Sequence, residues 1–94
     1  MKIRGLLWPA GIIEKLLLKH DVQELEVREL LEGKPKFFFV ESGHRAGEDL
    51  YSAWGQTEAG RYLIAFFIYT EEGEALILSA RDMSRSEKKR YERK

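Results

Sequence analysis

Two helical patterns occupy the first third of the sequence. Apolar residues recur at spacings of three to five over residues 9–20, which predicts a first helix with one apolar stripe. Asp21 is followed three residues later by Glu24, a capping-box arrangement that predicts the start of a second helix. Gly33 then ends this second helix, because glycine is the usual residue just past a helix C-terminus.

The rest of the chain changes to strand patterns and then to one last helix. Apolar and aromatic runs separated by turn residues predict four strands, near residues 37–40, 50–54, 62–69 and 75–80. The run 62–69 is apolar on both faces and is therefore the expected central strand. Ser84 and Glu87 form another capping box, which opens a short C-terminal helix. The predicted fold class is α+β: two N-terminal helices, a four-stranded antiparallel sheet and a C-terminal helix.

Composition restricts the chemistry that this fold can carry. The chain has 94 residues, 44% of them hydrophobic and 34% charged, so we expect a single packed domain over residues 1–94. It contains no cysteine and only two histidines, which excludes thiol nucleophiles and disfavours a transition-metal site. No phosphate-binding glycine motif or serine elbow is found. Any enzymatic activity is therefore expected to need neither metal nor cofactor.

The location of the protein is predicted from what its sequence lacks. No segment reaches the roughly 18 consecutive apolar residues of a membrane helix. Residues 1–9 have a charged start, but the apolar run is too short for a signal peptide. We expect a cytoplasmic protein without membrane contact.

The net charge of zero hides an asymmetry along the chain. Residues 1–80 carry 9 basic and 13 acidic side chains, whereas residues 81–94 carry 7 basic and 3 acidic ones. A basic end on an otherwise acidic domain indicates an anionic partner at that end.

Two arginines are the leading candidates for binding a phosphate. Arg81 follows an apolar strand directly and precedes a capped helix, where a guanidinium can grip a phosphate with two hydrogen bonds. Arg61 opens the central strand, and a simple hairpin register would set residue 61 opposite residue 83, at the same end and on the same face as Arg81. The alternatives are an ordinary ion pair of Arg81 with Asp82 or another surface carboxylate, and an Arg61 that is solvated in its turn or bonded to Glu58.

Further basic residues can extend such a site along an RNA backbone. Basic side chains surround Tyr91 in the C-terminal helix: Arg85, Lys88, Lys89, Arg90, Arg93 and Lys94. Lysine and arginine neutralise phosphates, and an aromatic ring can stack on an unpaired base. The alternatives are a solvated helix face and a Tyr91 ring that docks the helix onto the sheet.

Candidates for proton transfer lie elsewhere in the sequence. Lys15 and Lys19 are neighbours on the first helix and add positive charge, and His20 follows them. His20, Lys19 or Glu48 can serve as a general base. The alternatives are a half-buried histidine that completes an apolar stripe and a glutamate that only protects a sheet edge.

The sequence resembles the BrnT family of type II toxins over nearly its whole length. The resemblance rests on Trp8, Lys15, residues 19–22, 47–51, 55–63 and 77–83, Glu87 and Tyr91. Its most specific part is the strand that ends in Ser79-Ala80-Arg81, followed by a basic helix with a tyrosine.

The resemblance implies a RelE-like fold and a metal-free ribonuclease that arrests translation. It also implies a ribbon-helix-helix antitoxin, similar to BrnA, through which alone the complex would contact DNA. Arg61 and Arg81 match arginines of the family's active face, whereas Lys19, His20, Glu48 and Tyr91 match positions of less defined role. Because RelE-like scaffolds also carry other activities, among them gyrase inhibition, the alternative is a non-catalytic protein that acts by binding a partner.

Overall fold

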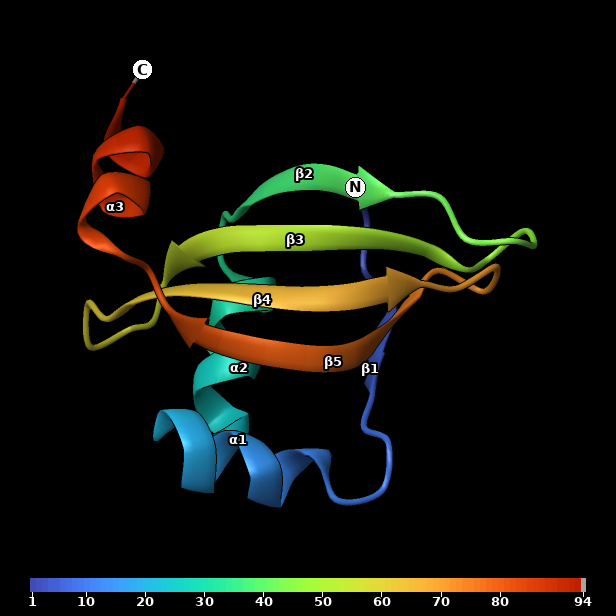
Figure 1. The fold of residues 1–94 in the computed structure, drawn as a ribbon, viewed down its shortest axis with the longest axis horizontal. Helices are drawn as coiled ribbons and strands as arrows, with labels where there is room; N and C mark the ends of the chain where they lie inside the picture. Colours follow the sequence, from blue (N-terminus) through green and yellow to red (C-terminus); the bar gives the residue numbers. More distant parts are fainter. Residues whose placement is uncertain (94) are drawn as a thin grey trace.

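The computed structural model describes residues 1–93 as a sheet with two helices on one face and a third at one end of the other (Figure 1). The elements are β1 (Gly5–Leu7), α1 (Ile12–His20), α2 (Glu24–Glu32), β2 (Lys36–Glu41), β3 (Asp49–Gln56), β4 (Tyr62–Tyr69), β5 (Glu74–Asp82) and α3 (Arg85–Glu92). The predicted α+β class is confirmed, and each of the four predicted strands and three predicted helices is present.

The sheet differs from the prediction in one strand. It has five strands in the order β1-β5-β4-β3-β2, and β1 pairs with β5 in parallel. The sheet is therefore mixed, and the prediction of a four-stranded antiparallel sheet is wrong in this respect. β1 spans three residues, too few to show an alternating pattern in the sequence. As predicted, β4 is the central strand.

The junction between the two N-terminal helices also differs from the prediction. Asp21 ends α1 with φ of 52°, in the left-handed region that often closes a helix. The capping box of α2 is formed by Gln23 and Glu26 instead of Asp21 and Glu24. The capping box of Ser84 and Glu87 at the start of α3 is confirmed.

The hydrophobic core lies between the sheet and the helices α1 and α2. Leu16 of α1 and Leu30 of α2 are fully buried against the sheet face that carries Leu63, Ala65 and Phe67. Opposing residues of antiparallel strands point to the same face, so Ala53, Ala65 and Ala80 share this helix-covered face. Small side chains there let the helices approach the sheet closely.

A β-bulge in β5 sets which residues reach the other face of the sheet. Next to the hairpin turn Tyr69 pairs with Ala75, but the register shifts between Phe66 and Phe67, and farther along Ile64 pairs with Arg81. The extra residue is Leu78. The predicted register, which sets residue 61 opposite residue 83, is therefore wrong by one. Since a shift of one residue reverses the facing of a strand, Arg81 points away from the helix-covered face.

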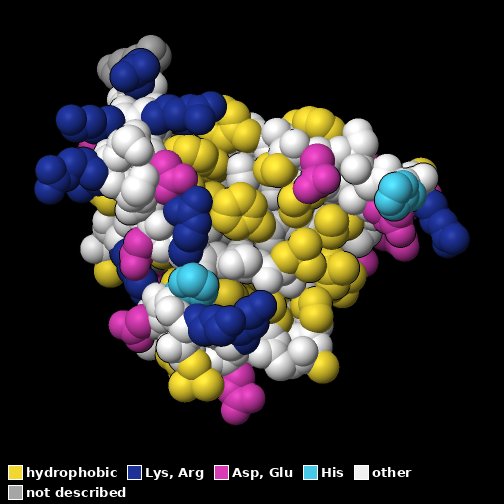
Figure 2. All heavy atoms as spheres, in the orientation of Figure 1, with side chains coloured by type: hydrophobic (Ala, Val, Ile, Leu, Met, Phe, Trp, Pro, Cys, Tyr) yellow, Lys and Arg dark blue, Asp and Glu magenta, His cyan; other side chains and the backbone are white. Residues whose placement is uncertain are grey.

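We call the sheet face opposite α1 and α2 the open face. Alternate strand residues supply it: Phe38, Ser52, Trp54, Ile64, Phe66, Ser79 and Arg81. α3 lies against one end of this face, where the Tyr91 ring packs edge-on against Tyr62 at 5.9 Å. Figure 2 shows hydrophobic side chains over the rest of the open face and basic side chains along the flank from α3 down to α1.

Candidate functional site

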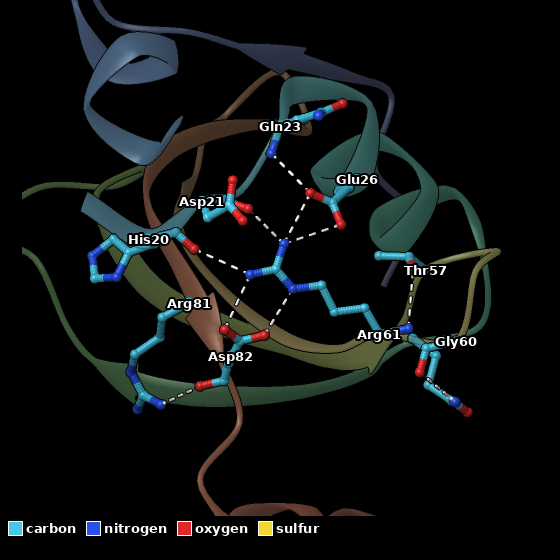
Figure 3. A network of polar contacts seen from close by, with 10 residues as sticks. His20, Asp21, Gln23, Glu26, Thr57, Gly60, Arg61, Arg81 and Asp82 are labelled. Carbon is cyan, nitrogen blue, oxygen red and sulfur yellow. Dashed lines mark hydrogen bonds and ion pairs between the residues drawn. The ribbon is translucent and has the colours of Figure 1, made fainter. Parts of the chain in front are cut away.

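Arg61 is the centre of a polar network on the helix-covered face of the sheet (Figure 3). Its Nε and Nη2 donate to the two carboxylate oxygens of Asp82 at 2.8 and 3.0 Å. Its Nη1 donates to the carboxylate of Glu26 at 3.0 Å and to the backbone oxygen of Asp21 at 2.6 Å. Its Nη2 also donates to the backbone oxygen of His20 at 3.1 Å.

These bonds use all five N–H donors of the Arg61 guanidinium. The hydrogen bonds to Asp82 and Glu26 raise the pKa of Arg61 far above its ordinary value, and those from Arg61 lower the pKa of Asp82. The two backbone oxygens belong to the C-terminal end of α1, which otherwise leaves carbonyl groups without partners. Arg61 therefore joins α1, α2 and β5, and no donor is left for a ligand.

Arg81 is bound less completely, on the open face. Its Nη1 and Nη2 donate to the two carboxylate oxygens of Glu87 at 2.7 and 2.9 Å, and Nη1 also donates to the Asp82 backbone oxygen at 3.1 Å. Its side chain is 37% exposed and its guanidinium lies 5.6 Å from the centre of the Phe66 ring. The Nε–H and the second Nη2–H have no partner within residues 1–93, and we call them the side-on pair.

Glu87 fixes the orientation of Arg81. Its carboxylate accepts the two Arg81 bonds and a third from the Ser84 backbone N–H at 2.8 Å. These contacts, Arg81 first, lower the pKa of Glu87 to about 2, so the ion pair persists at neutral pH. Because the same carboxylate caps α3, the position of the helix and the direction of the side-on pair are coupled.

The two arginines do not converge on one point. Arg81 and Asp82 are consecutive strand residues and point to opposite faces of the sheet. Arg61 binds the side chain of Asp82 on the helix-covered face. Arg81 lies on the open face, and its one contact with Asp82 is a hydrogen bond to the backbone oxygen. The expected grip of both guanidinium groups on a single phosphate is therefore wrong.

His20 is the titratable candidate that lies near Arg81. In Figure 3 its backbone oxygen points to Arg61, whereas its imidazole points away from the network, on the side where Arg81 lies. The imidazole is close enough to Asp82 to contribute to the lowered pKa of that carboxyl group. Lys15 and Lys19 are exposed on α1, and Figure 2 shows basic side chains on that flank of the open face.

The basic residues of α3 line the same end of the open face. Arg85 and Lys89 are exposed, and the Lys88 ammonium lies 4.3 Å from the centre of the Tyr62 ring. The Tyr91 ring packs against Tyr62, and the Tyr91 backbone oxygen accepts a hydrogen bond from Lys36 at 2.6 Å. These contacts show that Tyr91 docks α3 onto the sheet, which is the alternative to stacking on an RNA base.

Glu48 lies at the far end of the sheet. It precedes β3, whose first residue Asp49 pairs with Tyr69, whereas Arg81 is aligned with Trp54 through β4. Five strand residues separate these positions, which corresponds to about 17 Å. Its carboxylate accepts a hydrogen bond from the Arg45 backbone N–H within its own loop. Glu48 therefore does not share a site with Arg81.

Two features of the site have little signal in the sequence. Phe66 lies beneath the Arg81 guanidinium, and Arg90 lies over Phe38 and Trp54 at 5.5 and 5.4 Å from the ring centres. The apolar character of residues 62–69 on both faces is the one hint, since it leaves aromatic rings outside the core. The contact of Arg81 with Phe66 depends on the bulge in β5, which turns Arg81 to this face.

The described residues contain no obvious metal centre. No group of three or more His, Asp or Glu side chains within residues 1–93 is arranged to hold a metal ion. None of the helices in this part of the chain is long and apolar enough to cross a membrane. The sequence matches no known protein-family model, and no curated protein matches it.

Proposed function

We propose that this protein is the toxin of a type II toxin–antitoxin system and that it cleaves RNA without a metal ion. The observation that carries the proposal is the side-on pair of Arg81. Two parallel N–H donors fit two oxygens of one phosphate, and the basic side chains along the flank from α3 to α1 attract an RNA backbone.

The chemistry of the proposal is cleavage by the 2′-hydroxyl of the RNA itself. A base takes the proton of the 2′-hydroxyl, the 2′-oxygen bonds to phosphorus, and the bond from phosphorus to the 5′-oxygen breaks. The departing 5′-oxygen takes a proton, so the products end in a 2′,3′-cyclic phosphate and a 5′-hydroxyl. Arg81 stabilises the charge that develops on the phosphate oxygens.

The remaining candidates for proton transfer, Lys19 and His20, are on α1. The imidazole of His20 can take the 2′-hydroxyl proton, and the Lys19 ammonium can give a proton to the 5′-oxygen. The roles of these two residues are exchanged if Lys19 is the base. Glu48 is left out because of its distance, and Arg61 because it has no free donor.

The biological setting of the proposal follows from the resemblance to BrnT toxins. The partner is a ribbon-helix-helix antitoxin that covers the basic flank of the open face, and the complex contacts DNA only through that antitoxin. Both proteins act in the cytoplasm, where translated RNA is the target. Arrest of growth on expression, relieved by co-expression of the neighbouring short gene, tests this setting.

The activity itself is tested with purified protein, single-stranded RNA and EDTA, with and without ribosomes. We expect products with cyclic phosphate ends, no cleavage of an all-2′-deoxy analogue, and strongly reduced cleavage by Arg81→Ala. Arg45→Ala is the matched control, because Arg45 is exposed in the loop at the far end of the sheet. Intact RNA under both conditions would refute the proposal.

A second function is favoured by a different observation. Phe38, Val40 and Leu78 of the sheet are 37%, 44% and 38% exposed, an apolar surface that suits a protein partner. A non-catalytic interaction protein would arrest growth as well with Arg81→Ala as with the wild type. It would leave RNA intact in both assays.

A further inference from the structure

The outer strand β2 is an exposed apolar edge of the sheet. It pairs with β3 on one side and with no strand of residues 1–93 on the other. Phe38, Phe39 and Val40 are 37%, 55% and 44% exposed. Edge strands are ordinarily protected by charges, proline or β-bulges; residues 37–40 contain no charge and no proline, and β2 is regular from Lys36 to Phe39, with a bulge at Val40. The edge therefore has the character of a surface that is covered by another strand.

We propose that β2 pairs in antiparallel orientation with β2 of a second copy of this chain. A two-fold axis at Phe38 sets Phe37 opposite Phe39 of the second copy. Phe37 and Phe39 point to the same face, because they pair with Ala53 and Tyr51 on the helix-covered side. A register slipped by one residue would oppose side chains of different faces, so this register suits the alternation of the strand.

The charges at the two ends of β2 favour pairing with itself in this orientation. Lys36 begins the strand and Glu41 ends it. Antiparallel pairing brings each Lys36 toward the Glu41 end of the other copy, whereas parallel pairing would bring like charges together. α3 adds further positive charge at the Lys36 end, where Lys36 donates to the backbone oxygens of Tyr91 and Arg93. Figure 1 shows α3 rising past the level of β2 at that end.

Pairing through β2 produces a closed dimer. The other edge strand, β1, spans three residues and offers little to a third copy. A two-fold interface uses each β2 once, so growth stops at two copies. Both open faces lie on the same side of the joined sheet, which sets two Arg81 sites on one surface. The dimer itself does not depend on the proposed RNA chemistry.

Sedimentation velocity of the full chain tests this assembly. The chain has a mass of 11.0 kDa, so a dimer has twice that mass, 22.0 kDa. Phe39→Lys sets a charged side chain opposite Phe37 of the second copy, within the regular part of β2, and is expected to give the monomer mass. Leu18→Lys is the matched control, because Leu18 is 80% exposed on α1, away from β2, and this variant should remain a dimer. A monomeric wild type, or equal loss of the dimer in both variants, would overturn the proposal.

Cross-linking tests the register independently. The chain has no cysteine, so a single introduced thiol can only bond to the same thiol of another copy. Residue 38 faces itself across the axis at a Cα separation of about 5 Å, which a disulfide can span. We expect oxidation to cross-link Phe38→Cys. Leu78→Cys is the matched control: it is equally exposed, at 38% against 37%, but lies on β5 and should not cross-link. Equal cross-linking of both variants would contradict the register.

Discussion

Arg61 and Arg81 occupy the same end of the sheet and form ion pairs of similar length, yet they differ in how many N–H donors remain without a partner. Arg61 binds two carboxylates and two backbone oxygens on the helix-covered face and has no N–H donor left. Arg81 binds one carboxylate and one backbone oxygen on the open face and keeps the side-on pair. The comparison teaches that the donors left over, more than the presence of an ion pair, decide whether an arginine can bind a ligand.

The largest effect that separates the two arginines is expected in catalysis. Under the proposed mechanism, Arg81→Ala removes the side-on pair and is expected to lower RNA cleavage by about 100-fold, because a donor that stabilises transition-state charge is lost. Its effect on the free energy of unfolding is expected to stay below about 1 kcal/mol, since the pair with Glu87 is partly exposed. Cleavage rates and urea denaturation of one preparation measure both quantities. A variant that unfolds easily but cleaves normally would reverse the assignment.

The next effect concerns stability on the other face of the sheet. Arg61→Ala leaves the carboxylates of Glu26 and Asp82 and two backbone oxygens without their donor, which is expected to cost about 2 kcal/mol of unfolding free energy. Urea denaturation measures this loss.

Arg61→Lys serves as the control for charge alone. A lysine keeps the positive charge but cannot replace five fixed donors, so it should restore only part of the stability. Both Arg61 variants should keep the wild-type cleavage rate per folded molecule. A cleavage defect as large as that of Arg81→Ala would show that Arg61 acts on RNA.

The elements of this fold are well encoded in the local sequence. The run of residues 62–69 is apolar on both faces because Ile64 on one face and Phe67 on the other are both buried. The bounds of β4 are those predicted from this run. The capping box of Ser84 and Glu87 is likewise a local signal, and it correctly marks the start of α3. β1 is missed because its pairing with β5 is a long-range contact of only three residues.

The candidate site is less predictable, because it depends on a single extra residue. The bulge at Leu78 turns Arg81 from the helix-covered face to the open face, and no turn signal in the sequence marks it. The partners of Arg61 come from α1, α2 and β5, which are brought together only by tertiary packing. Glu58, the neighbour considered in the sequence, is not among the partners of Arg61.

A smaller effect tests whether the surface beside Arg81 continues onto α3. Each lysine that neutralises a phosphate of single-stranded RNA contributes about 0.7 to the slope of log affinity against log salt. Lys89→Ala should reduce this slope by about that amount, whereas Arg45→Ala should leave it unchanged. Binding of an uncleavable 2′-deoxy oligonucleotide at several salt concentrations measures the slope. Equal slopes in the wild type and Lys89→Ala would exclude α3 from the RNA surface.

The smallest expected effect is the acid sensitivity of the contact between Arg81 and Glu87. The hydrogen bonds from Arg81, together with those from Ser84, lower the pKa of Glu87 from 4.5 to about 2 in the folded protein. A folded pKa below the unfolded value gives stability that is complete above about pH 4.5 and is lost as the pH falls toward 2. The difference is expected to stay below about 1 kcal/mol, because Arg81 is 37% exposed and water screens the pair.

Glu87→Gln isolates this contribution, because glutamine keeps an acceptor for Arg81 but cannot titrate. Asp82, whose pKa Arg61 also lowers, loses stability in the same direction in both proteins and therefore cancels in the comparison. Urea midpoints between pH 4.5 and 2 should fall more steeply for the wild type than for Glu87→Gln. Parallel curves would mean that the Arg81 pair adds nothing to stability, whereas a difference of several kcal/mol would make Arg81 as structural as Arg61.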